Sequence, residues 1–166
     1  RHDEALDAYD RALELTPDNP ILNSLAWSLY NIEEEKPLAQ AETYAQRAVE
    51  KSPDVGAYQH TLAAILGAQD KWSEAMSHVP LFLQDTQMVS TSLNEVIAFF
   101  VDAAAAGYVA EALKHIQASP SAEILEPMAV ALQLYEGEQV DVALEILEVA
   151  KDVVKRIEAR KEEKRK

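Results

Sequence analysis

The strongest constraint in this sequence is a helical pattern that recurs every 31 to 37 residues. Each copy starts with an alanine and has an apolar residue four positions later, and in four of the five copies another apolar residue follows after three more. These residues share one face of an α-helix, because their spacing matches its period. The leading alanines are Ala5, Ala41, Ala75, Ala112 and Ala143. A repeat of this length predicts a stack of similar structural units.

A second helical signature precedes each of the last four alanines. It begins with a large residue that is followed directly by a second residue, which is small in three of the four copies. An apolar residue stands three positions after the second one. The four copies are Leu25-Ala26-x2-Leu29, Leu62-Ala63-x2-Leu66, Phe99-Phe100-x2-Ala103 and Val130-Ala131-x2-Leu134. Each unit is therefore expected to be a pair of helices, with small residues where the two approach closely. Gly67, Gly107 and Gly137 fall between the paired helices, where we expect a residue with positive φ to end the first helix.

The pattern predicts helices over nine segments: 3–15, 20–32, 37–51, 55–68, 71–84, 91–106, 109–118, 123–136 and 139–162. Pro80 lies inside one of them and removes a hydrogen bond to the carbonyl of Met76, so a kink or a break is expected there. Pro127 is compatible with a helix that begins at about Glu126. Residues 84–92 show no clear helical face and are predicted to form a long connector.

The composition is that of a globular protein of one domain. The chain has 166 residues, of which 48% are hydrophobic and 27% charged, and it contains no cysteine. No apolar run is long enough to cross a membrane and no signal peptide is recognisable, which indicates a cytoplasmic protein. The net charge of −14 divides into −18 for residues 1–150 (7 basic, 25 acidic) and +4 for residues 151–166 (8 basic, 4 acidic). Such acidity disfavours nucleic-acid binding, and it either maintains solubility or attracts a basic partner.

The two-helix unit resembles the tetratricopeptide repeat, which has a large–small pair in its first helix, a small alanine in its second and a terminal proline, like Pro17 and Pro53 here. The resemblance implies an all-α, right-handed superhelical array of antiparallel helix pairs that ends in a long C-terminal capping helix. It implies a single domain over 1–166, in which 1–18 is the second helix of a truncated repeat and 19–54, 55–89, 90–120 and 121–166 are successive pairs, the last two degenerate. The chain is then expected to be a fragment, with further repeats before Arg1. The alternative is an irregular helical bundle with accidental periodicity.

In arrays of this kind the first helices line a concave surface, and the resemblance implies that a partner binds there. Projection of the first two units places Gly67 and six candidate binding residues on this surface: Asn23, Trp27, Tyr30, Asn31, His60 and Ala64. An aromatic pair flanked by amides suits a peptide-binding groove, because it offers apolar area together with hydrogen bonds to a peptide backbone. The alternative is that Trp27 and Tyr30 pack against a neighbouring helix.

The predicted first helices, 20–32, 55–68, 91–106 and 123–136, contain no lysine or arginine. Some tetratricopeptide proteins clamp the terminal carboxylate of a partner with basic residues on these helices, and that mode is unsupported here. The expected partner is a neutral, apolar or basic segment of another protein.

The sequence assembles no recognisable catalytic or metal site. Its four histidines, His2, His60, His78 and His115, lie in different repeats without metal-ligand spacing. The glycines are isolated rather than gathered in a phosphate-binding loop, and no serine stands in a recognisable triad. We therefore predict no catalytic residue, no cofactor and no metal, and a protein that is not an enzyme.

The predicted last helix carries two apolar rows. The second row consists of Val142, Ile146, Val149 and Val153. Either an earlier helix that curls back covers this row, or a second copy of the chain covers it and forms a homodimer. The basic end of this helix is interrupted by acids, so it indicates a solvated terminus rather than a membrane or nucleic-acid patch.

Together these features predict a scaffold or adaptor that binds a peptide or helix of a partner protein without catalysis. The alternative is that the chain is the C-terminal sensing or regulatory arm of a larger multidomain protein, such as an NTPase or a peptidase. A small enzyme in its own right is a third possibility.

Overall fold

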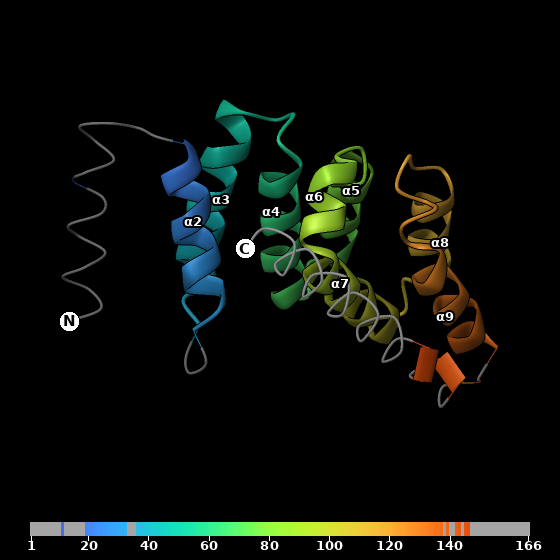
Figure 1. Ribbon diagram of the computed structural model, residues 1–166. Helices are drawn as coiled ribbons and strands as arrows, with labels where there is room; N and C mark the ends of the chain where they lie inside the picture. Colours follow the sequence, from blue (N-terminus) through green and yellow to red (C-terminus); the bar gives the residue numbers. More distant parts are fainter. Residues whose placement is uncertain are drawn as a thin grey trace, which may run out of the picture.

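The computed structural model describes residues 11, 19–32, 36–137, 139, 142, 143, 145 and 146. Within this part of the chain every regular element is a helix, and no strand occurs. The helices are α2 (Asn19–Tyr30), α3 (Leu38–Lys51), α4 (Gly56–Ala68), α5 (Trp72–Phe82), α6 (Thr86–Thr91), α7 (Leu93–Ala105), α8 (Val109–Gln117) and α9 (Glu126–Glu136) (Figure 1). The prediction of an all-α fold is confirmed for the described residues.

Most predicted helices are found within a few residues of their expected bounds. The segments 3–15 and 139–162 fall almost entirely outside the described residues. The predicted connector over 84–92 is wrong, because this segment contains the short helix α6. Asp85 caps it by accepting a hydrogen bond from the backbone N–H of Met88 at 2.9 Å, and Met88 and Val89 are buried. A helix of six residues is too short to show a periodic face, so the cap was its main sequence signal.

Two of the helix prolines, Pro127 and Pro80, behave differently from each other. Pro127 lies in the first turn of α9, which begins at Glu126 as predicted. Of the kink or break expected at Pro80, the break does not occur, since α5 continues through the proline to Phe82. Met76, Val79 and Phe82 bury the core face of α5 on both sides of the proline, and this packing holds the helix together where one backbone hydrogen bond is missing.

Of the three glycines expected to have a positive φ, only Gly107 does, at φ 93°. In the turn between α4 and α5 the left-handed residue is Asp70, at φ 61°. Gly67 instead lies inside α4, where a Cβ atom would stand 2.8 Å from the Trp72 ring. Gly137 has φ −80°. The expectation is therefore wrong for Gly67 and Gly137, and Gly67 is needed for a close aromatic contact rather than for its conformation.

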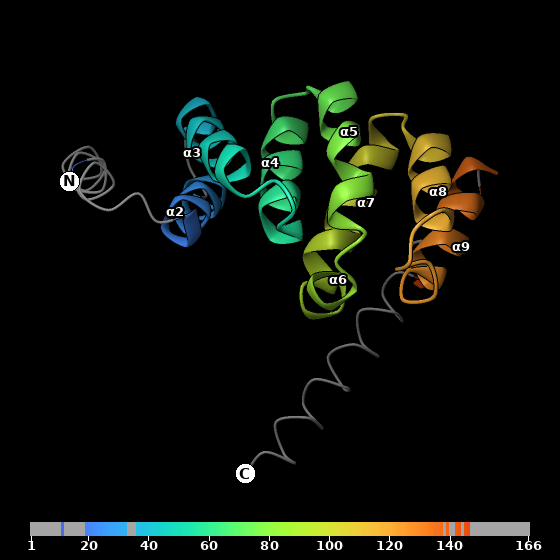
Figure 2. The same ribbon diagram turned by 90° about the horizontal axis from the view of Figure 1, so that it is seen from above.

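The helices follow one another in a curved row from α2 to α9, and the chain reverses direction from α2 to α3 and again from α3 to α4 (Figures 1 and 2). Four helices, α2, α4, α7 and α9, form one line, because each contacts the next. The intervening helices pack against them: α3 on α2 and α4, α5 on α4, and α8 on both α7 and α9, while α5 also contacts α8. This alternation brings the predicted first helices of successive units together.

Small residues fill the contacts between these helices, as the repeat pattern predicted. The alanines of the two signatures that the structure describes are all at most 2% exposed: Ala26, Ala41, Ala45, Ala48, Ala63, Ala75, Ala103, Ala112, Ala131 and Ala143. Larger rings fill the centre, where Phe82 and Phe99 meet edge to face at 5.7 Å between centroids. The hydroxyl of the buried Ser121 donates to the carbonyl of Leu83 at 2.8 Å, which ties the α8–α9 loop to the end of α5. None of the described helices is long and apolar enough to span a membrane.

Candidate functional site

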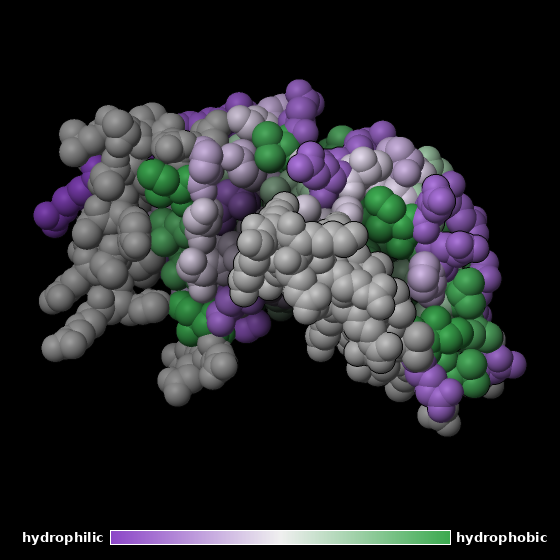
Figure 3. All heavy atoms as spheres, in the orientation of Figure 1, coloured by the Kyte–Doolittle hydropathy of each residue, from purple (hydrophilic) through white to green (hydrophobic). Residues whose placement is uncertain are grey.

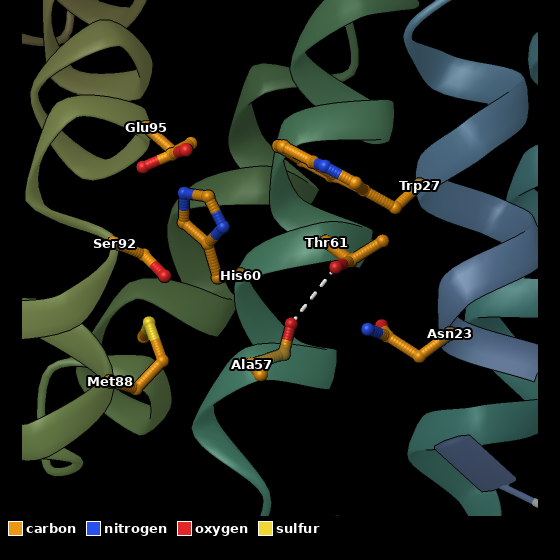
Figure 4. A pocket seen from close by; sticks show the side chains of 8 residues that line it. All are labelled: Asn23, Trp27, Ala57, His60, Thr61, Met88, Ser92 and Glu95. Atoms are coloured by element: carbon orange, nitrogen blue, oxygen red, sulfur yellow. Dashed lines mark hydrogen bonds between the residues drawn. The ribbon is translucent and has the colours of Figure 1, made fainter. Parts of the chain in front are cut away.

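Two adjoining cavities of about 160 and 350 Å³ lie between α2, α4 and α7. Trp27, His60 and Glu95, one from each of these helices, line both cavities. We call the joined space the α2–α4–α7 groove. Figure 4 shows Asn23 and Trp27 reaching from α2 and Glu95 from α7 toward the α4 residues between them. The groove therefore runs across three successive helices of one line of the fold.

All six residues predicted for the concave surface line this groove: Asn23, Trp27, Tyr30, Asn31, His60 and Ala64. Trp27 and Tyr30 lie 5.2 Å apart between ring centroids, and both are partly buried against the core. The sequence left open whether this pair lines a groove or packs against a neighbouring helix. Each ring does both, since it packs on its neighbours and also lines the cavity. Their participation in binding stays a prediction.

The sequence projection missed the α7 side of the groove, which consists of Glu95, Ala98, Phe99 and Asp102. On α2 and α4 the lining residues have equal offsets from the large residue of the signature, Leu25 or Leu62: two before it, two after it and five after it. The same offsets applied to Phe99 do not reach Glu95 or Asp102. They do so from Ile97, because Ile97-Ala98-x2-Val101 also follows the large–small pattern. This second, overlapping match is the sequence signal that could have identified the groove residues on α7.

Trp72, at the start of α5, was also missed as a groove residue. Its ring packs directly over Gly67 and lies 5.7 Å from Phe99 and 6.2 Å from Tyr108 between centroids. A side chain at position 67 would push this ring away. The glycine that was expected to end a helix therefore helps to place an aromatic wall of the groove.

The charged residues that line the groove are both acidic. Glu95 and Asp102 come from α7, and none of the lining residues, all within the described part of the chain, is a lysine or an arginine. Partial burial raises the pKa of the Asp102 carboxyl, and the nearby Lys36 ammonium offsets part of this effect. Burial and the Asp102 charge together raise the pKa of the Tyr30 hydroxyl. The site thus has a negative potential next to aromatic rings.

Lys36 approaches the groove from the segment that precedes α3. Its Nζ atom lies 4.6 Å from the centroid of the Tyr30 ring, which is a cation–π contact. The side chain is otherwise exposed to solvent. A cation of this chain therefore already sits at the edge of the aromatic wall.

His60 lies at the centre of the groove and is only 5% exposed. Its ring is 5.9 Å from Trp27, 5.2 Å from Phe82 and 6.3 Å from Phe99 between centroids. Burial lowers the pKa of His60 to about 4, so the imidazole is neutral at pH 7. Its Nε2 atom and the Oδ1 atom of Asn23 are buried and have no hydrogen-bond partner among the described residues.

The other titratable groups do not converge on the groove. His78 lies within 2.6 Å of Gln59 through Nδ1, and Gln59 in turn donates to the carbonyl of Pro53 at 2.7 Å. Lys71 pairs with Glu42 at 2.8 Å and connects α3 to the turn before α5. Among the described residues no three His, Asp or Glu side chains are arranged to hold a metal ion.

The predicted second apolar row of the last helix is only partly within the described residues. Val142 is 46% exposed, and Ile146 is partly buried against the core. Val149 and Val153 lie outside the described residues. Figure 3 shows hydrophobic residues gathered at the α9 end of the molecule, where Val130, 40% exposed, adds to the apolar surface. What covers this row, an earlier helix or a second copy, stays a prediction.

The sequence matches no protein-family model, and neither curated proteins nor solved structures gave a match. The likeness to the tetratricopeptide repeat therefore depends on the residue pattern and the helix arrangement alone.

Proposed function

We propose that this chain is a non-catalytic, cytoplasmic scaffold or adaptor module of the tetratricopeptide-like class, which binds a segment of a partner protein in the α2–α4–α7 groove. The observation that carries the proposal is the convergence of the six predicted surface residues on one groove. They stand at repeat positions of two different units.

The helix arrangement supports the tetratricopeptide-like part of the proposal. Successive first helices contact each other in the line α2, α4, α7 and α9, and the buried alanines stand at the helix contacts. A right-handed superhelix built from such pairs would extend the groove along its concave side.

The chemistry of the groove supports a peptide or helix as the ligand. The partly buried rings of Trp27 and Tyr30 offer aromatic surface of the kind that dominates binding energy at protein interfaces, and the buried Trp72 and Phe99 form the wall beside them. Asn23 and Asn31 offer amides that can pair with a peptide backbone. Because its charged lining residues are carboxylates, the groove suits a neutral or basic segment better than an acidic one.

The experiment is selection of peptides from a random displayed library on the intact chain, followed by titration of the selected peptides. The chain has two tryptophans, Trp27 and Trp72, and both line the groove, so tryptophan fluorescence reports directly on its occupancy. We expect a saturable change in fluorescence and a loss of affinity of about 10-fold or more for Trp27→Ala and Tyr30→Ala. The matched control is Tyr135→Ala, which removes a 36% exposed ring on α9. Peptides that bind Trp27→Ala as tightly as the wild type would refute the groove as the binding site.

A further inference from the structure

The larger cavity of the groove has the size and lining of a pocket for one side chain. Its volume of about 350 Å³ is at the lower end of the ~300–1,000 Å³ that is usual for ligand pockets. The rings of Trp27, Tyr30 and Trp72 line it together with the carboxylate of Asp102. A flat cation satisfies both kinds of lining at once, because ring faces and carboxylates both attract positive charge.

The chain itself provides an example of this recognition. Lys36 places its ammonium 4.6 Å from the Tyr30 ring centroid, and its charge stabilises the ionised form of Asp102. Lys36 is exposed to solvent, so a ligand can displace it without disturbing the core. The contact between the Lys36 ammonium and the Tyr30 ring therefore shows that the edge of the pocket can accommodate a cation.

Unpaired polar atoms in the groove provide an independent observation; Asn23 lines the smaller, adjoining cavity, and His60 lines both cavities. The Nε2 atom of His60 and the Oδ1 atom of Asn23 are buried at the groove without a partner among the described residues. His60 is 5% exposed, and its ring stands between Glu95 and the α2 side chains in Figure 4. An amide oxygen accepts hydrogen bonds only, so Asn23 Oδ1 requires a donor. The groove thus offers one amide oxygen that only accepts, on Asn23, and the carboxylates of Glu95 and Asp102 to a ligand that has several N–H donors.

We infer that the groove recognises an arginine side chain of the partner segment, which stacks on Trp27 and Tyr30, pairs with Asp102 and displaces Lys36 from the Tyr30 ring. Arginine fits better than lysine, because its guanidinium is planar, stacks on aromatic faces and carries five N–H donors. This inference rests on the proposed function, since it names the residue by which the groove selects its partner.

The test uses the intact chain and N-acetyl-arginine amide as the probe, with N-acetyl-lysine amide and N-acetyl-glutamine amide for comparison. The indole N–H signals of Trp27 and Trp72 are followed by NMR. We expect saturable shifts with the arginine probe at a Kd in the millimolar range, weaker binding by about threefold or more for lysine, and no saturation for glutamine. Equal shifts with the glutamine probe would overturn the inference.

Two substitutions separate specific recognition from general attraction to an acidic protein. Asp102→Asn should weaken the arginine probe about fivefold or more, whereas Glu136→Gln, which removes the same charge from the exposed surface of α9, should leave its Kd unchanged. Lys36→Ala should tighten binding about twofold, because it removes the internal competitor. Equal effects of Asp102→Asn and Glu136→Gln, or weaker binding by Lys36→Ala, would overturn the inference. Circular dichroism melting of each variant verifies that it is folded.

The peptide selection described above distinguishes the two proposals. If selected peptides bind the groove but are not enriched in arginine and are insensitive to Asp102→Asn, the arginine inference fails while the proposed function stands. If no peptide binds but the arginine probe saturates both indole signals, the cation pocket stands and the partner-binding function fails.

Discussion

Burial of His60 makes the stability of this protein sensitive to acid. The ring lies 5% exposed among Trp27, Phe82 and Phe99, and burial lowers its pKa from 6.5 to about 4. In the unfolded chain the same imidazole titrates near its ordinary value. Between these two pH values the unfolded state therefore binds a proton that the folded state does not.

The sign and size of the effect follow from this difference in pKa. Because the unfolded state binds more protons between pH 6.5 and about 4, the free energy of unfolding falls as the pH is lowered through this window and is unaffected by His60 above it. At about 1.36 kcal/mol for each pH unit, the loss amounts to about 3 kcal/mol by pH 4. A loss of that size is a large part of the ~5–15 kcal/mol that holds a domain folded.

The perturbation is His60→Leu, which removes the titrating group and the unpaired Nε2 atom while it keeps an apolar side chain in the core. Urea unfolding followed by circular dichroism, from about pH 7.5 to about pH 4.5, gives the free energy of unfolding at each pH. The wild type should lose about 2–3 kcal/mol more than His60→Leu over this range. Burial also lowers the pKa of His78, but this histidine is present in both proteins and cancels in the comparison.

A control and a refuting result are available in the same series. The control is His60→Met, which also removes the titrating group and should show the same reduced pH dependence as His60→Leu. If wild type and His60→Leu lose stability in parallel as the pH falls, His60 is not buried in its neutral form and the reasoning is wrong.

Three further predictions concern the packing around the groove. Gly67→Ala should lower the free energy of unfolding by about 1 kcal/mol, because overpacking against the Trp72 ring (~1–3 kcal/mol) outweighs the better helix propensity of alanine (~1 kcal/mol). The control is Gly137→Ala, where the nearest atom to the new Cβ is 3.6 Å away. A Gly67→Ala protein that is more stable than the wild type would contradict the contact with Trp72. Asp85→Ala should remove about 1 kcal/mol by deleting the cap of α6 and should accelerate hydrogen exchange in that helix, whereas unchanged exchange would show that the cap is dispensable. Ser121→Val should cost about 1–3 kcal/mol in thermal unfolding, because a backbone carbonyl at the end of α5 loses its buried donor, and an unchanged Tm would argue against that hydrogen bond.

The part of the fold that the sequence predicted is the part with repeated spacing. Helices α3, α4 and α8 each present an apolar face or a long apolar run bounded by proline, glycine or polar turns, so their positions follow from periodicity. The six groove residues were found for the same reason, since the Leu25 and Leu62 units keep one register.

The missed features depend on contacts between distant residues. Gly67 is required by the Trp72 ring, five positions later, which packs back on α4. A glycine in the sequence does not reveal whether it serves a positive φ or a close contact. Helix α6 depends on one cap and two buried side chains, a signal too short for a periodic search. Glu95 and Asp102 were missed because the large–small pattern fits α7 in two overlapping ways, from Phe99 and from Ile97. The burial of Phe100 and Ala103 agrees with the match from Phe99, whereas the cavity lining agrees with the match from Ile97.

Buried polar atoms of the described residues that lack a side-chain or backbone partner gather at the α2–α4–α7 groove, which agrees with the inferred arginine site. Buried polar groups in folded proteins are nearly always hydrogen-bonded, because leaving one unpaired costs about 1–3 kcal/mol. Among the described residues three buried side-chain atoms lack a partner, and two of them, on Asn23 and His60, line the same groove. An apolar residue at either position would avoid this cost, as the neighbouring Leu22 and Leu62 do within the core. The Asn23 Oδ1 atom accepts hydrogen bonds only, and it shares the groove with aromatic rings and a carboxylate, so a donor-rich partner would satisfy it where a purely apolar one would not.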